Sequence, residues 1–211
     1  MMPYKIVVDA DMVLIDYMAQ LVRYVEDVRG HRAMMSYKFD PSYDLTYTFP
    51  SLKPAEMQEI IRDLSVAEDY YIEIPLIDGA VDGVRHLREA FPDTSIVCVT
   101  SGGNHPLTRE MRLKNLAPFE LDEIITLPLN GSKVETLLEL QEPGGQCILF
   151  DDSIGHVQAA AENGQVGVLY TQPYNSDEDV LHRVDDWNSI VQWCAANLPH
   201  LLAQSSARLR V

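Results

Sequence analysis

Short apolar runs alternate along this chain with longer segments of helical periodicity. Three runs are typical of buried strands that end in a polar side chain: Lys5–Asp9, Ser95–Thr100 and Gln146–Asp151. Two weaker strands are predicted at Glu123–Thr126 and Val166–Leu169. Because strands that alternate with helices form βαβ units, the pattern predicts an α/β fold with a doubly wound, parallel, Rossmann-like sheet.

Helical periodicity fills the segments between these strands. Apolar residues recur at positions 81, 84, 87 and 90, which predicts a helix over Val81–Ala90. Lys133–Leu140 and His156–Glu162 have helical patterns as well, and Asn163-Gly164 is a stop signal for the second.

The segment from Tyr17 to Pro75 breaks this alternation. It contains two predicted helices, near Met18–Val28 and Pro54–Leu64, joined by a connection rich in aromatic residues. We interpret residues 17–75 as a small helical cap inserted after the first strand, and residues 1–16 and 76–211 as the α/β core domain. The connection contains Tyr43, Tyr47 and Phe49, which could line the site, but most of these are expected in the hydrophobic core of the cap.

Charge and cysteine content narrow the class of protein. A net charge of −16 and a pI near 4.6 argue against a nucleic-acid polymer as partner, because its phosphates would be repelled. Any phosphate site would therefore need a metal ion or a few well-placed cations. Three cysteines favour a reducing compartment over a disulfide framework. No signal peptide and no apolar run of the ~18 residues that span a bilayer are recognisable, so we expect a cytoplasmic protein without membrane contact.

Pairs of carboxylates follow two of the predicted strands. Asp9 and Asp11 flank the end of the first, and Asp151 and Asp152 end the strand at Gln146–Asp151. The carboxyl ends of parallel strands meet at one edge of the sheet, so both pairs are expected there. Turn formation or helix capping explains a single aspartate, but adjacent buried carboxylates repel each other unless a cation neutralises them. Hard oxygen ligands favour Mg²⁺.

Two further polar segments are expected near this edge. Thr100-Ser101-Gly102-Gly103 can hold phosphate oxygens through hydroxyls and amides, although a simple glycine-rich turn has the same composition. Lys133 falls in the first turn of a predicted helix, where cations are disfavoured. Neutralising a phosphate explains that position, and so does chance placement on the surface.

These segments resemble the haloacid dehalogenase-like (HAD) phosphohydrolase superfamily. Its four motifs match in order, over roughly residues 4–16 and 76–170: Val7-Val8-Asp9-Ala10-Asp11-Met12-Val13-Leu14, Val99-Thr100, Lys133, and Phe150-Asp151-Asp152-Ser153. Lys114 is an alternative for the lysine. Met12 departs from the pattern, since many relatives have glycine there, and it could narrow the entrance to the site.

The resemblance implies a role for each matched residue. Asp9 would be the nucleophile, and Asp11 the acid that protonates the leaving oxygen and the base that activates water. Thr100, Ser101 and Lys133 would bind the phosphoryl oxygens. Asp9, Asp151, Asp152 and the carbonyl of Asp11 would hold or support Mg²⁺. A second aspartate favours hydrolysis of a phosphomonoester, since dehalogenases of the superfamily need neither this acid nor Mg²⁺.

Finer similarity is to the 5′(3′)-deoxyribonucleotidase branch. It rests on Asp9–Tyr17, on Tyr70–Ala80 and on Val184–Asn188. This implies a nucleoside monophosphate as substrate, with Tyr17 stacking on the base or, equally, packing the cap on the core. A phosphatase for sugar phosphates or other small monoesters, a phosphomutase and a catalytically silent binding protein stay open. A homodimer is also open.

Overall fold

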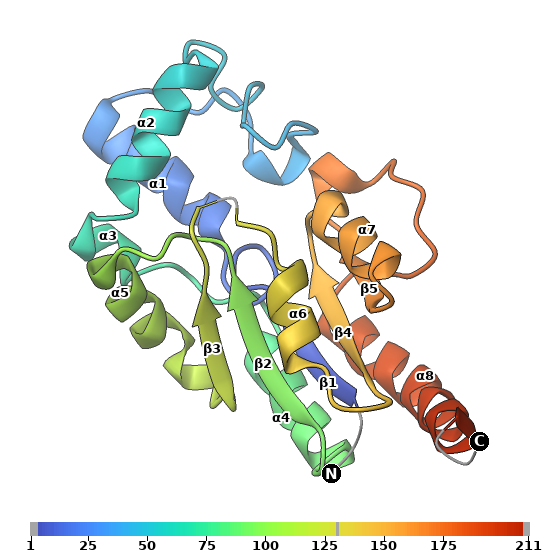
Figure 1. The fold of residues 1–211 in the computed structure, drawn as a ribbon. Helices are drawn as coiled ribbons and strands as arrows, with labels where there is room; N and C mark the ends of the chain where they lie inside the picture. The colour runs from blue at the N-terminus through green and yellow to red at the C-terminus, as the bar shows by residue number, and fades with distance from the viewer. Residues whose placement is uncertain (1–3, 130, 209–211) are drawn as a thin grey trace.

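In the part of the chain that the structure describes, six strands form one parallel sheet (Figure 1). The structure is a computed structural model that describes residues 4–129 and 131–208; residues 1–3 and 209–211, which the sequence assigns to the core domain, lie outside this part. The strand order is β3-β2-β1-β4-β5-β6. The bounds are β1 Tyr4–Val8, β2 Ser95–Thr100, β3 Glu123–Thr126, β4 Gln146–Asp151, β5 Val166–Tyr170 and β6 Arg183–Val184. The predicted α/β fold with a parallel sheet is confirmed.

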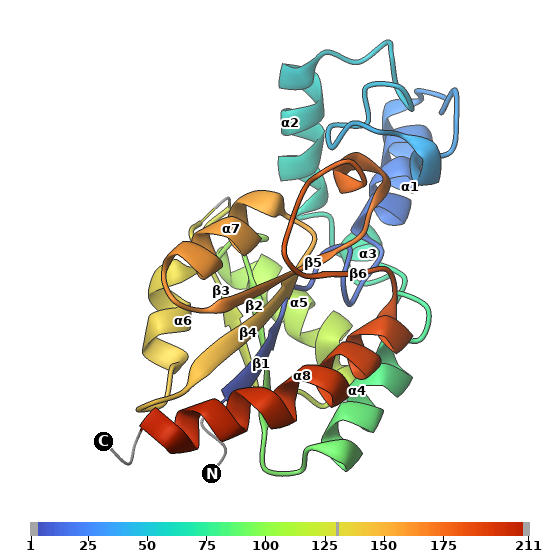
Figure 2. The same cartoon turned by 90° about the vertical axis from the view of Figure 1, so that its right-hand side faces the viewer.

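Helices cover both faces of the sheet (Figure 2). Alternate strand residues point to opposite faces. Ile6 and Val8 of β1 pack in the hydrophobic cluster that contains residues of α4, α5 and α8. Val7 packs in a second cluster with residues of α6 and α7. The bounds are α4 Ala80–Ala90, α5 Pro106–Leu116, α6 Val134–Leu140, α7 Ile154–Glu162 and α8 Trp187–Arg208. The sheet is therefore doubly wound, as predicted.

The helical insert after β1 lies beyond the carboxyl ends of the strands (Figure 1). It consists of α1 (Tyr17–Arg29), the 3₁₀ turn η1 (Tyr37–Phe39), α2 (Pro54–Leu64) and α3 (Glu68–Tyr71). These elements have a hydrophobic cluster of their own, which includes Phe49. The domain boundaries at residues 17 and 75 remain a prediction.

The aromatic connection within the insert differs in part from expectation. Phe49 is buried, but Tyr43 and Tyr47 are 66% and 59% exposed. The expectation that most of these aromatics form the core of the cap is therefore wrong for two of the three. Tyr43 instead lies with its ring edge-on to Tyr174, with the centroids 5.1 Å apart. Tyr174 belongs to the turn η3 (Pro173–Asn175) that follows β5.

The loop after β1 is fixed by contacts from the C-terminal part of the core. The Trp187 indole is buried and donates a hydrogen bond to the Val13 carbonyl at 2.7 Å, and the Gln172 amide donates to the Met12 carbonyl at 2.8 Å. Met12 has φ of +61°, a left-handed conformation that glycine adopts without strain. The left-handed φ explains why glycine suits this position. In this chain, methionine adopts the same conformation.

Among residues 4–129 and 131–208, no helix combines the length and the apolar character required to cross a lipid bilayer.

Candidate active site

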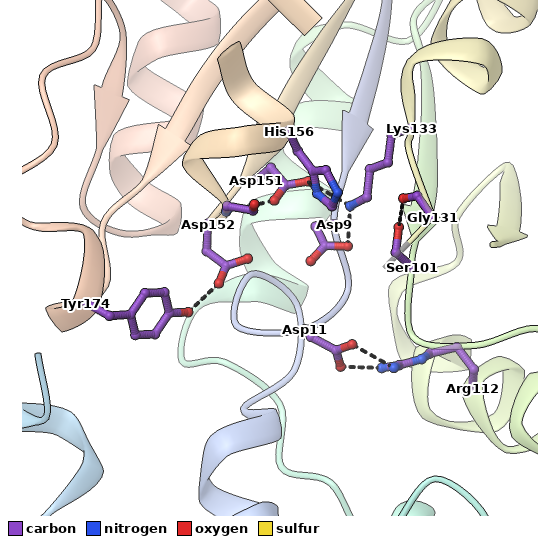
Figure 3. Close-up of polar contacts among 11 residues, drawn as sticks. Asp9, Asp11, Ser101, Arg112, Gly131, Lys133, Asp151, Asp152, His156 and Tyr174 are labelled. Atoms are coloured by element: carbon purple, nitrogen blue, oxygen red, sulfur yellow. Dashed lines mark hydrogen bonds and ion pairs between the residues drawn. The ribbon is translucent and has the colours of Figure 1, made fainter. Parts of the chain in front are cut away.

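Three aspartates and a lysine meet where β1 and β4 end (Figure 3). Asp9 directly follows β1, Asp151 ends β4 with Asp152 after it, and Lys133 caps the N-terminus of α6. The parallel register places Val8 beside Phe150, so the residues that follow them share one sheet edge. All four side chains are buried.

Lys133 bridges two of the aspartates. Its ammonium donates to Asp9 Oδ1 at 2.5 Å and to Asp151 Oδ2 at 2.7 Å. Burial alone would lower the pKa of Lys133, but Asp151 and Asp9 outweigh it and raise the pKa above its usual value. This explains a cation at a helix N-terminus. Lys114, the alternative, is half-exposed on α5 and pairs with Glu110 at 2.9 Å.

The three carboxylates differ in the direction and size of their pKa shifts. Burial raises the pKa of Asp9 to about 6, although Lys133 opposes the shift. Burial acts the same way on Asp151, but Lys133 and His156 outweigh it and lower its pKa to about 2. For Asp152, burial and then the neighbouring charges of Asp151 and Asp9 hold the pKa well above the usual range.

This cluster fits a divalent cation. Asp9, Asp151 and Asp152 each offer a carboxylate oxygen, and these oxygens lie within 4.8 Å of one another. Three carboxylates exceed the single charge of Lys133, and burial makes the surplus negative charge costly. Hard oxygen donors of this kind suit Mg²⁺. The Tyr174 hydroxyl donates to Asp152, and so holds that carboxylate from the loop after β5.

The two hydroxyls at the end of β2 differ in their surroundings. The Thr100 hydroxyl is buried and has no hydrogen-bond partner among the described residues. The Ser101 hydroxyl donates to the Gly131 carbonyl at 2.8 Å and lines the cavity described below. Both residues therefore lie where the sequence places them, at the carboxyl end of the strand beside β1.

Asp11 has a partner that the sequence does not suggest. Arg112 of α5 donates one hydrogen bond to each oxygen of its carboxylate, at 2.7 and 2.8 Å. Arginine is ordinarily a surface residue, and nothing in the pattern of α5 marks this one as buried. Tyr174 was also missed, although the rule that strand ends share an edge would have drawn attention to the loop after β5.

A cavity of about 470 Å³ opens over these groups. Its floor includes Asp9, Asp11, Asp151 and Asp152, and its opposite wall comes from the helical insert. That wall has apolar side chains, Met18, Leu21, Met57 and Ile61, and polar ones beside them, Asp44, Gln58, Arg62 and Ser65. Tyr17 and Tyr43 also line the cavity, as do His105 and His156. A small molecule bound here would contact acidic groups at one end and apolar side chains at the other.

Comparison with solved structures identifies the fold. A haloacid dehalogenase-like family hydrolase from Streptococcus pneumoniae superimposes with a TM-score of 0.60 at 15% identity, covering 91% of this chain and 98% of that one. A HAD family hydrolase from Deinococcus radiodurans R1, with bound phosphate and sodium, gives 0.60 at 14% identity, covering 94% and 98%. A variant of CbbY from Rhodobacter sphaeroides, in complex with xylulose-(1,5)bisphosphate, gives 0.54 at 13%, covering 89% and 95%.

No protein-family model matches the chain, and no curated protein matches it in sequence. The structural likenesses, at 13–15% identity, show the fold of HAD-like hydrolases. They do not show the deoxyribonucleotidase branch that the sequence resemblance implies.

Proposed function

We propose that this protein hydrolyses phosphomonoesters through a phosphoryl group carried on Asp9, with Mg²⁺ as cofactor. The observation that carries the proposal is the buried bridge from Lys133 to Asp9 and Asp151, with Asp152 beside it. A carboxylate attacks a phosphate only if the negative charges of both are neutralised. The bridge supplies one cation at that point, and the carboxylate cluster fits a second.

The proposed reaction has two steps, transfer of the phosphoryl group to Asp9 and its hydrolysis. An oxygen of Asp9 attacks phosphorus while the bond to the ester oxygen breaks. Asp11 enters this step protonated on one oxygen, which gives up its hydrogen bond from Arg112, and it passes that proton to the ester oxygen. A water molecule then attacks phosphorus and transfers a proton to Asp11. The bond from phosphorus to Asp9 breaks, inorganic phosphate leaves, and the Asp9 carboxylate is restored.

The phosphoryl oxygens need donors in both steps. Lys133 is within reach of Asp9, and the hydroxyls of Thr100 and Ser101 end the neighbouring strand. The Thr100 hydroxyl, which has no partner among the described residues, supports this assignment because a buried polar group is normally satisfied. A bound Mg²⁺, held by Asp9, Asp151 and Asp152, would stabilise the charge that develops on the transferred group.

For the substrate we infer a (deoxy)nucleoside monophosphate. The sequence resemblance motivates it, and the cavity supports it because Tyr17, Tyr43 and apolar side chains of the insert line it together with the acidic groups. An aromatic ring beside an apolar surface suits a nucleobase. A sugar phosphate is the second candidate, favoured by the structural likeness to CbbY with its bound sugar bisphosphate.

A panel of phosphomonoesters assayed with Mg²⁺ tests both the proposed reaction and the proposed substrate. Release of phosphate from 4-nitrophenyl phosphate supports the reaction, and a preference for nucleoside monophosphates over sugar phosphates and phosphoglycolate supports the substrate. A preference for sugar phosphates would overturn the substrate alone. Failure to hydrolyse any member would overturn the reaction and favour a silent binding protein.

A further inference from the structure

Arg112 and Asp11 form a partly buried ion pair at the wall of the cavity (Figure 3). The arginine side chain is 2% exposed and that of Asp11 is 27% exposed. Two parallel hydrogen bonds engage both carboxylate oxygens, at 2.7 and 2.8 Å. Such a fork fixes the orientation of a carboxylate as well as its position, which a single contact from a lysine does not.

Tyr71 and Gly102 lie close against this ion pair. The Arg112 guanidinium lies over the Tyr71 ring, 5.1 Å from its centroid. A Cβ atom at Gly102 would lie 2.4 Å from Arg112 Nη2 and 3.2 Å from Asp11 Oδ2, so any larger residue there would displace the pair. The backbone at Gly102 and the Tyr71 ring therefore hold the guanidinium in place.

The two aspartates of the proposed reaction thus have separate cations. Asp9 contacts Lys133, whereas Asp11 contacts Arg112, and Figure 3 shows the Asp11 carboxylate turned toward Arg112. Asp11 belongs to the loop that contains the left-handed Met12, rather than to a strand. A side chain on a loop needs an external contact to keep a defined position, and catalytic groups tolerate only small displacements.

We propose that Arg112 is the positioning residue of Asp11: its guanidinium fixes the carboxylate beside Gly102, at the wall of the cavity that Asp9 also lines. This inference rests on the proposed function. It assigns to α5 a part in the reaction that none of the four sequence motifs includes. Arg112 itself acts through Asp11.

The dependence of kcat/KM on the leaving group tests this assignment. A series of substituted phenyl phosphates is measured with Mg²⁺, from 4-nitrophenyl phosphate to phenyl phosphate, because kcat/KM reports the first phosphoryl transfer and poorer leaving groups depend more on the proton from Asp11. In Arg112→Met we expect kcat/KM for phenyl phosphate to fall by ~10²-fold, within the range for loss of general acid catalysis. The value for 4-nitrophenyl phosphate should fall much less, so the slope against leaving-group pKa steepens.

Three variants complete the design. Asp11→Asn should show the same steep slope, and the double variant should be no steeper than Asp11→Asn alone, because residues that act as a unit are not additive. Arg112→Lys should recover part of the activity on phenyl phosphate. Arg109→Met, an exposed arginine one turn earlier on α5, should leave the slope unchanged.

The outcomes separate the two claims. A uniform fall in kcat/KM across the series with an unchanged slope would show that Arg112 only supports the fold, and it would overturn this inference while the proposed function stands. A wild-type protein inactive on the whole series would overturn the proposed function and this inference with it. If Arg112→Met does not fold, the slope of Arg112→Lys decides: a slope equal to that of the wild type with a uniformly lower rate contradicts the assignment.

Discussion

Lys133 Nζ lies 2.5 Å from Asp9 Oδ1, although 124 residues separate the two in the sequence. The same ammonium is 2.7 Å from Asp151 Oδ2. One buried cation therefore joins the end of β1 to the end of β4, and its removal would leave two carboxylates facing each other without compensation. The proposed chemistry and the stability of this sheet edge both depend on that contact.

Replacing Lys133 with Met should lower both activity and stability. Breaking a buried ion pair from one side costs about 3–5 kcal/mol, because the remaining charge is left desolvated. Urea denaturation in the presence of EDTA measures the loss, and the phosphatase assay measures the fall in kcat/KM. The matched control is Lys114→Met, because the ion pair of Lys114 with the exposed Glu110 lies on the surface and contributes little to stability. Equal losses of activity and stability in the two variants would contradict the role assigned to Lys133.

Mg²⁺ should restore activity that EDTA removes, and it should also stabilise the protein in a pH-dependent way. The folded-state pKa of Asp9 is about 6, above its ordinary value of 3.8. The folded state therefore binds this proton more tightly than the unfolded state, and the contribution of Asp9 to stability falls as pH rises from 3.8 to about 6. Protonated carboxylates do not bind the ion, so competition with protons weakens Mg²⁺ binding below about pH 6.

Thermal unfolding with and without Mg²⁺ at pH 5 and pH 8 measures this linkage. We expect the increase in Tm to be larger at the higher pH, and to be lost in Asp152→Asn. That variant should also be more stable than the wild type in EDTA at pH 8, since burial and its charged neighbours hold the pKa of Asp152 well above the usual range. A Tm that does not respond to Mg²⁺ at either pH would contradict the metal assignment.

Tyr17→Ala should raise KM for nucleoside monophosphates and leave 4-nitrophenyl phosphate almost unaffected. Stacking of a base on an aromatic ring contributes ~1–3 kcal/mol in single-strand binders, which corresponds to up to tens of fold in KM for a mononucleotide. Tyr43→Ala extends the test, because Tyr43 lines the same cavity, and Tyr47→Ala is the control, being exposed and outside the cavity lining. Equal losses on both substrates in Tyr17→Ala would indicate a structural role in packing the insert on the core.

Strands β2 and β4 were predictable from the sequence because they are almost entirely buried and have continuous apolar runs, whereas β3 is only partly buried and has a weaker run. Ser95–Thr100, Glu123–Thr126 and Gln146–Asp151 have the bounds expected from their apolar runs. The sheet edge that collects Asp9 and Asp151 follows from parallel topology alone. The helix Pro106–Leu116 was not predicted, because its sequence is mostly polar and its apolar stripe is narrow.

The contacts around Asp11 and Asp152 could not be predicted for a different reason. Arg112 becomes a buried residue only because Gly102 and Tyr71 enclose it, and these come from separate parts of the chain. Tyr174 reaches Asp152 through a short turn after β5 whose geometry periodicity does not encode. Tertiary packing, rather than local pattern, selects such partners.

The central claim is that phosphoryl transfer passes through Asp9, and a quenched-flow experiment on Asp11→Asn tests it most directly. This variant keeps the nucleophile but lacks the base that activates water, so with Mg²⁺ and 4-nitrophenyl phosphate we expect a burst of about one nitrophenolate per protein molecule, followed by slow turnover. Mass spectrometry of the acid-quenched protein should place the phosphoryl group on the peptide that contains Asp9, and Asp9→Asn should show neither burst nor turnover. Phosphorylation at another residue, or near-normal turnover by Asp9→Asn, would contradict the account.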